Sequence, residues 1–231
     1  MRRLLSTLVD RLLLVRARRR LARYGVDGPG ASLDRLTLDL EAVPGMMTRE
    51  AGPMLFALAA TQALAGDIVE IGSWQGRSTI FLASGARAAA NGTVYAVDHF
   101  RGNAGKEHLF RAGRDDLSDL PGRFGRNVER FGVSDRVELL AVDSASAART
   151  LRDRDVRVRL LFIDGNHEHD AVRADVDAFR GLLLPRALVV FDDYSTSFPG
   201  VTRCVHELVA AGALAPRFQY GRCFVAEAVR P

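Results

Sequence analysis

Cysteine is scarce in this sequence, and long apolar runs are absent from it. The two cysteines, Cys204 and Cys223, cannot form a disulfide framework, so we expect a protein of a reducing compartment such as the cytoplasm. No apolar stretch reaches the about 20 residues that a membrane-spanning helix needs. The composition, 48% hydrophobic and 26% charged over 231 residues, suits one soluble α/β domain with an appendage.

Basic charge is concentrated at one end of the chain, although the formal net charge is +4. Residues 1–25 hold eight arginines and a single acid, Asp10, and therefore carry +7. Residues 26–231 then sum to −3, so the main domain lacks the basic surface of a nucleic-acid binder. We expect no nucleic-acid partner.

The arginines of residues 1–25 alternate with leucines at helical spacing, which indicates a basic amphipathic helix. Asp10 and Arg11 interrupt its apolar run and no small-residue cleavage site follows, so we do not expect a secretory signal. Three interpretations stay open: a helix packed on its own domain or a partner subunit, a helix on a membrane surface, or a frayed tail. We expect residues 1–43 to form this helix and a linker ahead of a domain at 44–231.

The stretch 67–78, DIVEIGSWQGRS, lacks the common phosphate-binding glycine patterns. A dinucleotide fingerprint beginning at Gly72 would need glycine at Trp74 and glycine or alanine at Arg77, and no Gly-Lys-Ser/Thr ending is present. The pattern nevertheless predicts a buried strand, a tight glycine turn and a helix. Glu70, at the end of the strand, suits a ligand that carries an ammonium group and no pyrophosphate.

Further apolar runs predict strands at 93–98, 137–142, 159–164 and 186–191, with a hairpin at 217–220 and 223–227. Helical patterns lie between them, and Thr48 is expected to cap the helix before the first strand. The predicted fold is α/β, a doubly wound Rossmann-like sheet that is mostly parallel and ends in an antiparallel hairpin. Residues 99–135 are polar and rich in glycine, and we expect them to form a lid with a short helix around 127–131.

Polar residues follow the predicted second and third strands. Asp98 stands where ribose hydroxyls are held in nucleotide-binding α/β folds. Asp143 and Ser144 could reach the adenine edge, and Ser144 is equally suited to cap a helix.

Three aspartates close the fourth and fifth strands. Because the carboxyl ends of neighbouring parallel strands meet, we expect Asp164, Asp192 and Asp193 to converge. Their mutual repulsion would be relieved by a divalent cation, and oxygen ligands favour Mg²⁺, Mn²⁺ or Ca²⁺. Adjacent strand residues point to opposite faces, so Asp192 and Asp193 can share an ion only if the strand has already turned.

His167 follows Asp164 by three residues, after the Gly165-Asn166 turn. An imidazole there could take a proton from a hydroxyl that a metal has acidified. His169 is the rival base, although it lies nearer the start of the next helix.

Residues 69–78 (VEIGSWQGRS), 162–167 (FIDGNH) and 191–194 (FDDY) together resemble metal-dependent O-methyltransferases of the class I S-adenosylmethionine-dependent type. The resemblance covers about residues 44–227 and concerns bacterial enzymes that methylate macrolide sugars and, more distantly, catechol O-methyltransferase. It implies Mg²⁺ ligands at Asp164, Asp192 and Asp193, and His167 as base. It also implies contacts to S-adenosylmethionine at Glu70, Gly72, Ser73, Trp74, Gly76, Ser78, Asp98, His99, Asp143 and Ser144. One departure is Pro185-Arg186-Ala187, where such families have Pro-Gly-Gly.

The function expected from these motifs is methylation of a small-molecule hydroxyl that has a second oxygen beside it, on a natural-product sugar or a catechol-like compound. A non-catalytic nucleotide-binding or membrane-associated partner subunit with the same fold is the alternative. An NAD-linked dehydrogenase is disfavoured by Trp74 and Arg77. Whether the chain forms a homo-oligomer is left open.

Overall fold

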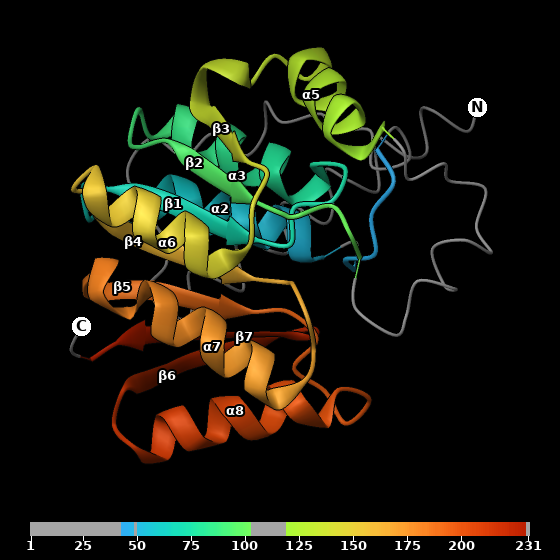
Figure 1. Ribbon diagram of the computed structural model, residues 1–231. Helices are drawn as coiled ribbons and strands as arrows, with labels where there is room; N and C mark the ends of the chain where they lie inside the picture. The colour runs from blue at the N-terminus through green and yellow to red at the C-terminus, as the bar shows by residue number, and fades with distance from the viewer. Residues whose placement is uncertain (1–42, 49, 103–118, 230–231) are drawn as a thin grey trace.

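The computed structural model describes residues 43–48, 50–102 and 119–229. Within them the chain forms a seven-stranded sheet of order β3-β2-β1-β4-β5-β7-β6 with helices on both faces (Figure 1). The expected helix of residues 1–25 and the middle of the expected lid, residues 103–118, lie outside the described residues. In the described part of the chain, no helix has the length and apolar character needed to cross a membrane.

Five parallel strands form the first part of the sheet. They are β1 (Asp67–Ile71), β2 (Val94–Val97), β3 (Val137–Leu140), β4 (Val158–Ile163) and β5 (Leu183–Phe191). The register pairs Ile71 with Val97 and Ile163, and Ile163 with Phe191, so these strand ends form one row. The central strands β1 and β4 are buried almost throughout, and their buried residues are apolar apart from Glu70 in β1 and Arg159 in β4.

An antiparallel hairpin completes the sheet. Strand β7 (Cys223–Ala228) pairs with β5, and β6 (Leu214–Tyr220) pairs with β7 at the edge. The predicted fold class is therefore confirmed, including the C-terminal hairpin.

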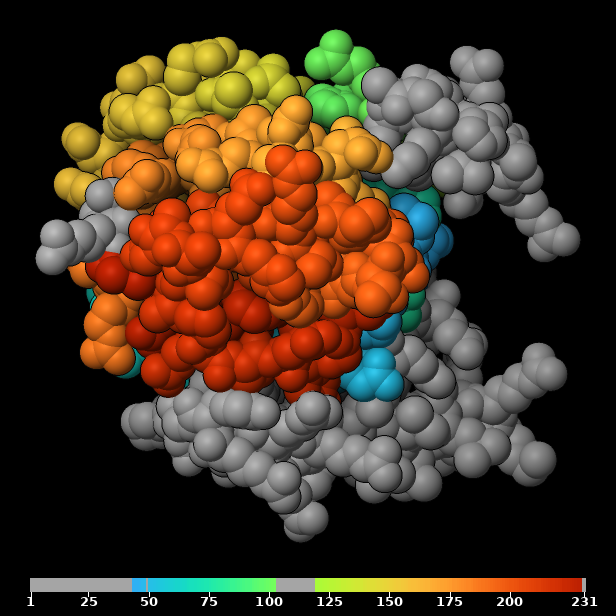
Figure 2. Space-filling model, turned by 90° about the horizontal axis from the view of Figure 1, so that it is seen from below, coloured from blue at the N-terminus to red at the C-terminus, as the bar shows by residue number. Residues whose placement is uncertain are grey.

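Within the described residues, six α-helices cover the two faces of the sheet. Helices α2 (Ala51–Thr61), α3 (Arg77–Ala88) and α5 (Leu120–Arg130) pack on one face. Helices α6 (Ser144–Asp153), α7 (His169–Phe179) and α8 (Pro199–Ala210) pack on the other. Alternate strand residues serve the two cores, as with Leu160 on the first side and Leu161 on the second. Figure 2 shows α8 and the C-terminal strands along the lower face of the molecule.

Three local predictions differ from the structure. Glu50, and not Thr48, stands at the N-cap of α2 and makes no side-chain cap, while the Thr48 carbonyl oxygen accepts the Ala51 amide at 3.1 Å. The helix expected around 127–131 begins earlier, at Leu120, since Pro121 fits the first turn of a helix. Strand β5 begins earlier than predicted, at Leu183, which pairs with Val158 ahead of a register shift before Leu188.

Candidate functional site

The glycine turn after β1 packs directly against the end of β4. Gly72 has a φ of 89°, and a Cβ placed on it would lie 2.1 Å from the carbonyl oxygen of Asp164. Gly76 has a φ of 87° and caps α3, and its Cβ would lie 3.1 Å from the ring of Phe124. Both glycines are therefore required by the close approach of other elements as well as by backbone conformation. The turn and Asp164 consequently belong to one site.

Asp98 ties the end of β2 to this turn. Its Oδ2 accepts the Trp74 amide at 2.8 Å, and its Oδ1 accepts the Phe100 amide at 2.7 Å. Trp74 is held at a φ of 42°, a conformation that few non-glycine residues adopt. Asp98 thereby fixes the shape of the turn from the position predicted for a ribose-binding acid.

A cavity of about 1030 Å³ opens over the carboxyl ends of the strands. Eight of the ten predicted cofactor residues line it: Gly72, Ser73, Trp74, Ser78, Asp98, His99, Asp143 and Ser144. Both ends of the expected lid border it too, through Phe100 on one side and Leu120 on the other. Glu70 and Gly76 do not line this cavity.

Glu70 lies beneath the turn and is fully buried. Its Oε2 accepts a hydrogen bond from the Thr79 hydroxyl, while Oε1 has no partner among the described residues. Burial raises the pKa of Glu70 to about 7, against the opposing effect of hydrogen bonds from Ser78 and Thr79. Its contact with a cofactor ammonium group stays a prediction.

The far end of the cavity is built around α6. Asp143, and not Ser144, caps this helix: its carboxylate accepts the Ser146 amide at 2.8 Å. Ser144 instead hydrogen-bonds the buried carboxylate of Asp175 on α7, which also lines the cavity. Asp175 was not predicted, although its spacing from Val172 and Phe179 places it on the inward face of α7.

The aspartates after β4 and β5 form the polar floor of the cavity. Strand β5 ends at Phe191, and Asp193 has a φ of 55°, so the chain has turned as a shared site requires. Ligand atoms of Asp164, His167 and Asp193 all lie within 4.8 Å of one another. Asp192 also lines the cavity, but its Oδ1 accepts a hydrogen bond from the thiol of Cys223 at 3.3 Å. We call Asp164, Asp192 and Asp193 the acid cluster.

The acid cluster is electrostatically strained. Burial raises the pKa of Asp164 well above its usual value, and the charges of Asp192 and Asp193 raise it further. Burial likewise raises the pKa of Asp192, and the Asp193 charge adds to this effect. A divalent cation would relieve this repulsion, and the carboxylate oxygens suit Mg²⁺ or Mn²⁺. The residues present therefore fit a metal ion.

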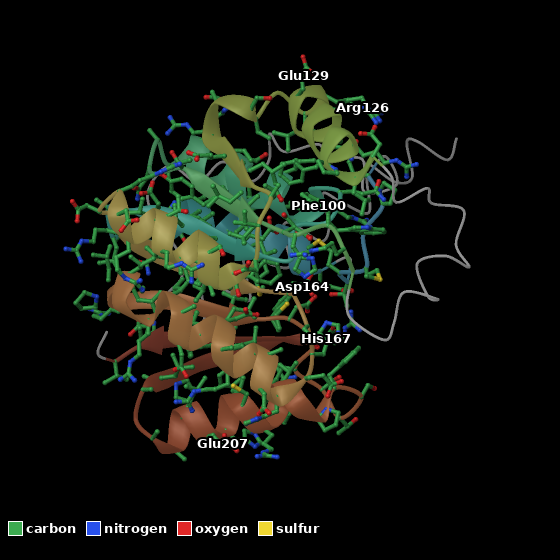
Figure 3. The ribbon with its side chains drawn as sticks, viewed as in Figure 1. Phe100, Arg126, Glu129, Asp164, His167 and Glu207 are labelled. Atoms are coloured by element: carbon green, nitrogen blue, oxygen red, sulfur yellow. The ribbon has the colours of Figure 1, made fainter. Side chains whose placement is uncertain are left out.

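The two histidines of this loop have different surroundings. His167 lines the cavity, with its Nε2 at 3.0 Å from Oδ2 of Asp193 and its ring edge-on to Phe198. His169 lies outside the cavity lining, between Asp170 at 2.7 Å and Glu207 at 2.8 Å. These two hydrogen bonds raise the pKa of His169. In Figure 3, Asp164 and His167 lie near each other, whereas Glu207 lies away on α8.

The sequence pattern of the family described as "Methyltransferase domain" matches residues 69–194, which is more than half of the chain. The chain belongs to this family. The matched segment runs from the glycine turn to the acid cluster, and so contains both halves of the site. The protein is a class I methyltransferase that depends on S-adenosylmethionine.

Solved structures with the same fold include several O-methyltransferases. The Bacillus cereus O-methyltransferase in complex with SAH is 19% identical, with a TM-score of 0.62 over 82% of this chain and 86% of that one. The O-methyltransferase NovP is 20% identical, with a TM-score of 0.61 over 97% and 100%. TomG from Streptomyces achromogenes, involved in tomaymycin synthesis, is 19% identical, with a TM-score of 0.60 over 80% and 82%. At these identities the likeness concerns the fold.

Arg222 is a further site residue that the sequence did not indicate. It precedes β7 in the turn of the hairpin, and its Nη1 lies 3.0 Å from Oδ1 of Asp193. Its guanidinium lines the cavity beside the acid cluster. Nothing in the local sequence pattern marks it, because its position depends on how β7 pairs with β5.

Proposed function

We propose that this methyltransferase methylates a hydroxyl oxygen that has a second oxygen beside it, with a divalent cation at the acid cluster. The observation that carries this proposal is the meeting of Asp164, Asp193 and His167 on the floor of the cavity next to the glycine turn. Binding of S-adenosylmethionine alone requires neither a buried group of repelling carboxylates nor an imidazole among them. Several proteins with the same fold are O-methyltransferases, which agrees with this choice of acceptor atom.

The carboxylates would hold Mg²⁺ or another hard divalent cation, which supplies positive charge that acidifies and orients an acceptor hydroxyl. S-adenosylmethionine supplies the electrophilic methyl group. Nε2 of His167 lies 3.0 Å from Oδ2 of Asp193, and it would be free to accept the hydroxyl proton when that carboxylate turns to hold the cation. The apolar side chains of Met47, Phe100 and Phe198 line the same cavity.

Mass spectrometry over a panel of vicinal diols, sugars and catechols tests this function. A compound that the enzyme accepts should show the mass increase of one methylation when Mg²⁺ is present. The increase should be absent when a chelator is in excess. Asp164→Asn should abolish this gain yet bind S-adenosylhomocysteine normally by calorimetry, while the exposed Asp153→Asn behaves as the parent. Full turnover in chelator would show that the transferase needs no metal.

The sugar of a natural product, the cytoplasmic location, a homo-oligomer and a membrane or subunit contact through residues 1–25 stay predictions. The described cavity supports a small-molecule acceptor, because it is concave and is bordered by the strand ends, α7 and residues 44–47.

A further inference from the structure

Arg222 brings a fixed positive charge into the region where the proposed function places a metal ion. Its Nη1 contacts Oδ1 of Asp193 at 3.0 Å, and its Nη2 donates to the carbonyl oxygen of Met46 at 3.3 Å. The Arg222 side chain is 35% exposed and that of Asp193 only 8% exposed, and both residues line the cavity. A partly exposed guanidinium therefore contacts a buried carboxylate.

Each oxygen of Asp193 lies near a nitrogen of another side chain, and the contact of Oδ1 with Arg222 is an ion pair without hydrogen-bond geometry. Nε2 of His167 lies 3.0 Å from Oδ2, and Arg222 lies on Oδ1. Arg222 also lowers the pKa values of Asp164 and Asp192, in opposition to their burial. Arg222 thus supplies the compensating positive charge that the acid cluster needs when no metal ion is bound.

We infer that Arg222 is the resident counter-ion of the acid cluster, and that it competes with a divalent cation for Asp193. The inference rests on the proposed function, since it presupposes that a cation binds there. Two positive charges on one carboxylate repel each other strongly in a partly buried site. Binding of the cation is therefore coupled to withdrawal of Arg222 from Asp193.

The surroundings of Arg222 offer the withdrawn guanidinium another place. Its Cζ lies 5.9 Å from the centre of the Phe198 ring, within the range of a cation–π contact, and the Met46 carbonyl is already within reach. The Nε atom of Arg222 is buried and has no hydrogen-bond partner among the described residues. The guanidinium already contacts the Phe198 ring and the Met46 carbonyl oxygen, so these contacts can hold it when it leaves Asp193.

Calorimetric titration with Mn²⁺, without S-adenosylmethionine or acceptor, tests the competition. Arg222→Gln should bind Mn²⁺ about tenfold or more tightly than the parent, because one repelling charge is removed. Arg222→Lys keeps the charge and should stay near the parent. Arg217→Gln is the matched control, since Arg217 lies on the same hairpin, pairs with Glu227 and does not line the cavity.

A thermal melt gives a readout that does not depend on turnover. In chelator Arg222→Gln should melt below the parent, because the acids lose their counter-ion, and Mn²⁺ should raise its Tm more than that of the parent. Should this variant fail to fold, the Nε–H resonance of Arg222 in the parent, assigned by its loss in Arg222→Lys, decides the question. It should shift on addition of Mg²⁺.

The outcomes separate the inference from the proposed function. If the parent binds Mn²⁺ and Arg222→Gln binds it no more tightly, Arg222 is no competitor and the metal-dependent function stands. If neither protein binds Mn²⁺, the metal itself is absent from the function and the inference falls with it. An Nε–H resonance that Mg²⁺ leaves unmoved in a metal-binding parent would also overturn the competition.

Discussion

Oδ2 of Asp193 lies 3.0 Å from Nε2 of His167, across the gap between the ends of β5 and β4. This contact exists because the chain turns at Asp193, which has a φ of 55°, directly after the strand. Aspartate tolerates this left-handed conformation better than most residues. The turn therefore points a carboxylate at the predicted base, and the role of that base can be tested on its own.

His167→Ala should lower kcat by roughly 10²- to 10⁴-fold, the usual contribution of a general base. Binding of Mn²⁺ should be nearly unchanged by calorimetry if His167 acts as a base. A large loss of Mn²⁺ affinity would instead make the imidazole a metal ligand. His169→Gln is the control: its ring is held by Asp170 and Glu207 outside the cavity lining, so turnover should persist.

Asp98→Ala should weaken binding of S-adenosylhomocysteine by about 10- to 100-fold, because two backbone amides lose their shared acceptor and the turn loosens. Asp98→Asn keeps one carbonyl oxygen, so its affinity for S-adenosylhomocysteine should lie between those of Asp98→Ala and the parent. Calorimetry measures both. Equal affinities for all three proteins would exclude Asp98 from the cofactor site.

The strand ends were predictable because apolar runs stop where the backbone reaches the polar edge of the sheet. Asp98 and Asp164 follow β2 and β4 in this way, and parallel pairing then brings them to one edge. Arg222 escaped prediction for the opposite reason. The antiparallel register that pairs Phe191 with Phe224 brings Arg222 beside Asp193, and no short-range pattern encodes that register.

The sequence could not predict in which direction the neighbouring side chains of Asp192 and Asp193 point. Alternation along β5 leaves open whether Asp192 or Asp193 meets Asp164, and the answer depends on the residue at which the strand yields to a turn. The three ligand atoms that lie together belong to Asp164, His167 and Asp193. Asp192 faces the thiol of Cys223, a neighbour that only the fold supplies.

Glu70 should make folding stability depend on pH. Its pKa rises from 4.5 to about 7 in the folded protein, so between these values only the unfolded chain loses the proton. The contribution of protonated Glu70 to the free energy of unfolding is thus fully present below pH 4.5 and falls as the pH rises toward 7. Above pH 7 the free energy of unfolding is lower by about 3 kcal/mol than below pH 4.5. Glu70→Gln should remove this fall. Urea unfolding at pH 5 and pH 8 measures it, with exposed Glu50→Gln as control, and an unchanged pH dependence would contradict the assignment.

Arg159 is a buried side chain that hydrogen-bonds two backbone carbonyl groups at the end of the sheet opposite the acid cluster. Its side chain donates to the carbonyl oxygens of Gly66 and Asn91, both at 2.9 Å, and burial lowers its pKa to about 10. Arg159→Met should cost about 2–5 kcal/mol, because two carbonyl groups lose their donor. Urea unfolding measures the loss, and Arg157→Met, at an exposed neighbouring position, should cost little. A loss below about 1 kcal/mol would mean that water replaces the guanidinium.

Arg186 occupies a left-handed conformation, with a φ of 66°, within β5. Such a backbone costs a non-glycine residue about 1–2 kcal/mol. Glycine removes this strain but adds about 0.4–1 kcal/mol of unfolded-state entropy, so Arg186→Gly should stabilise the fold by roughly 0.5–1 kcal/mol. The control is Arg217→Gly in β6, where φ is not positive. Both arginines lie 3.6 Å from Glu227, so each variant loses an ion pair with the same carboxylate. The control should lose stability while Arg186→Gly gains it, and a loss of equal size in both would show that the backbone at Arg186 is not strained.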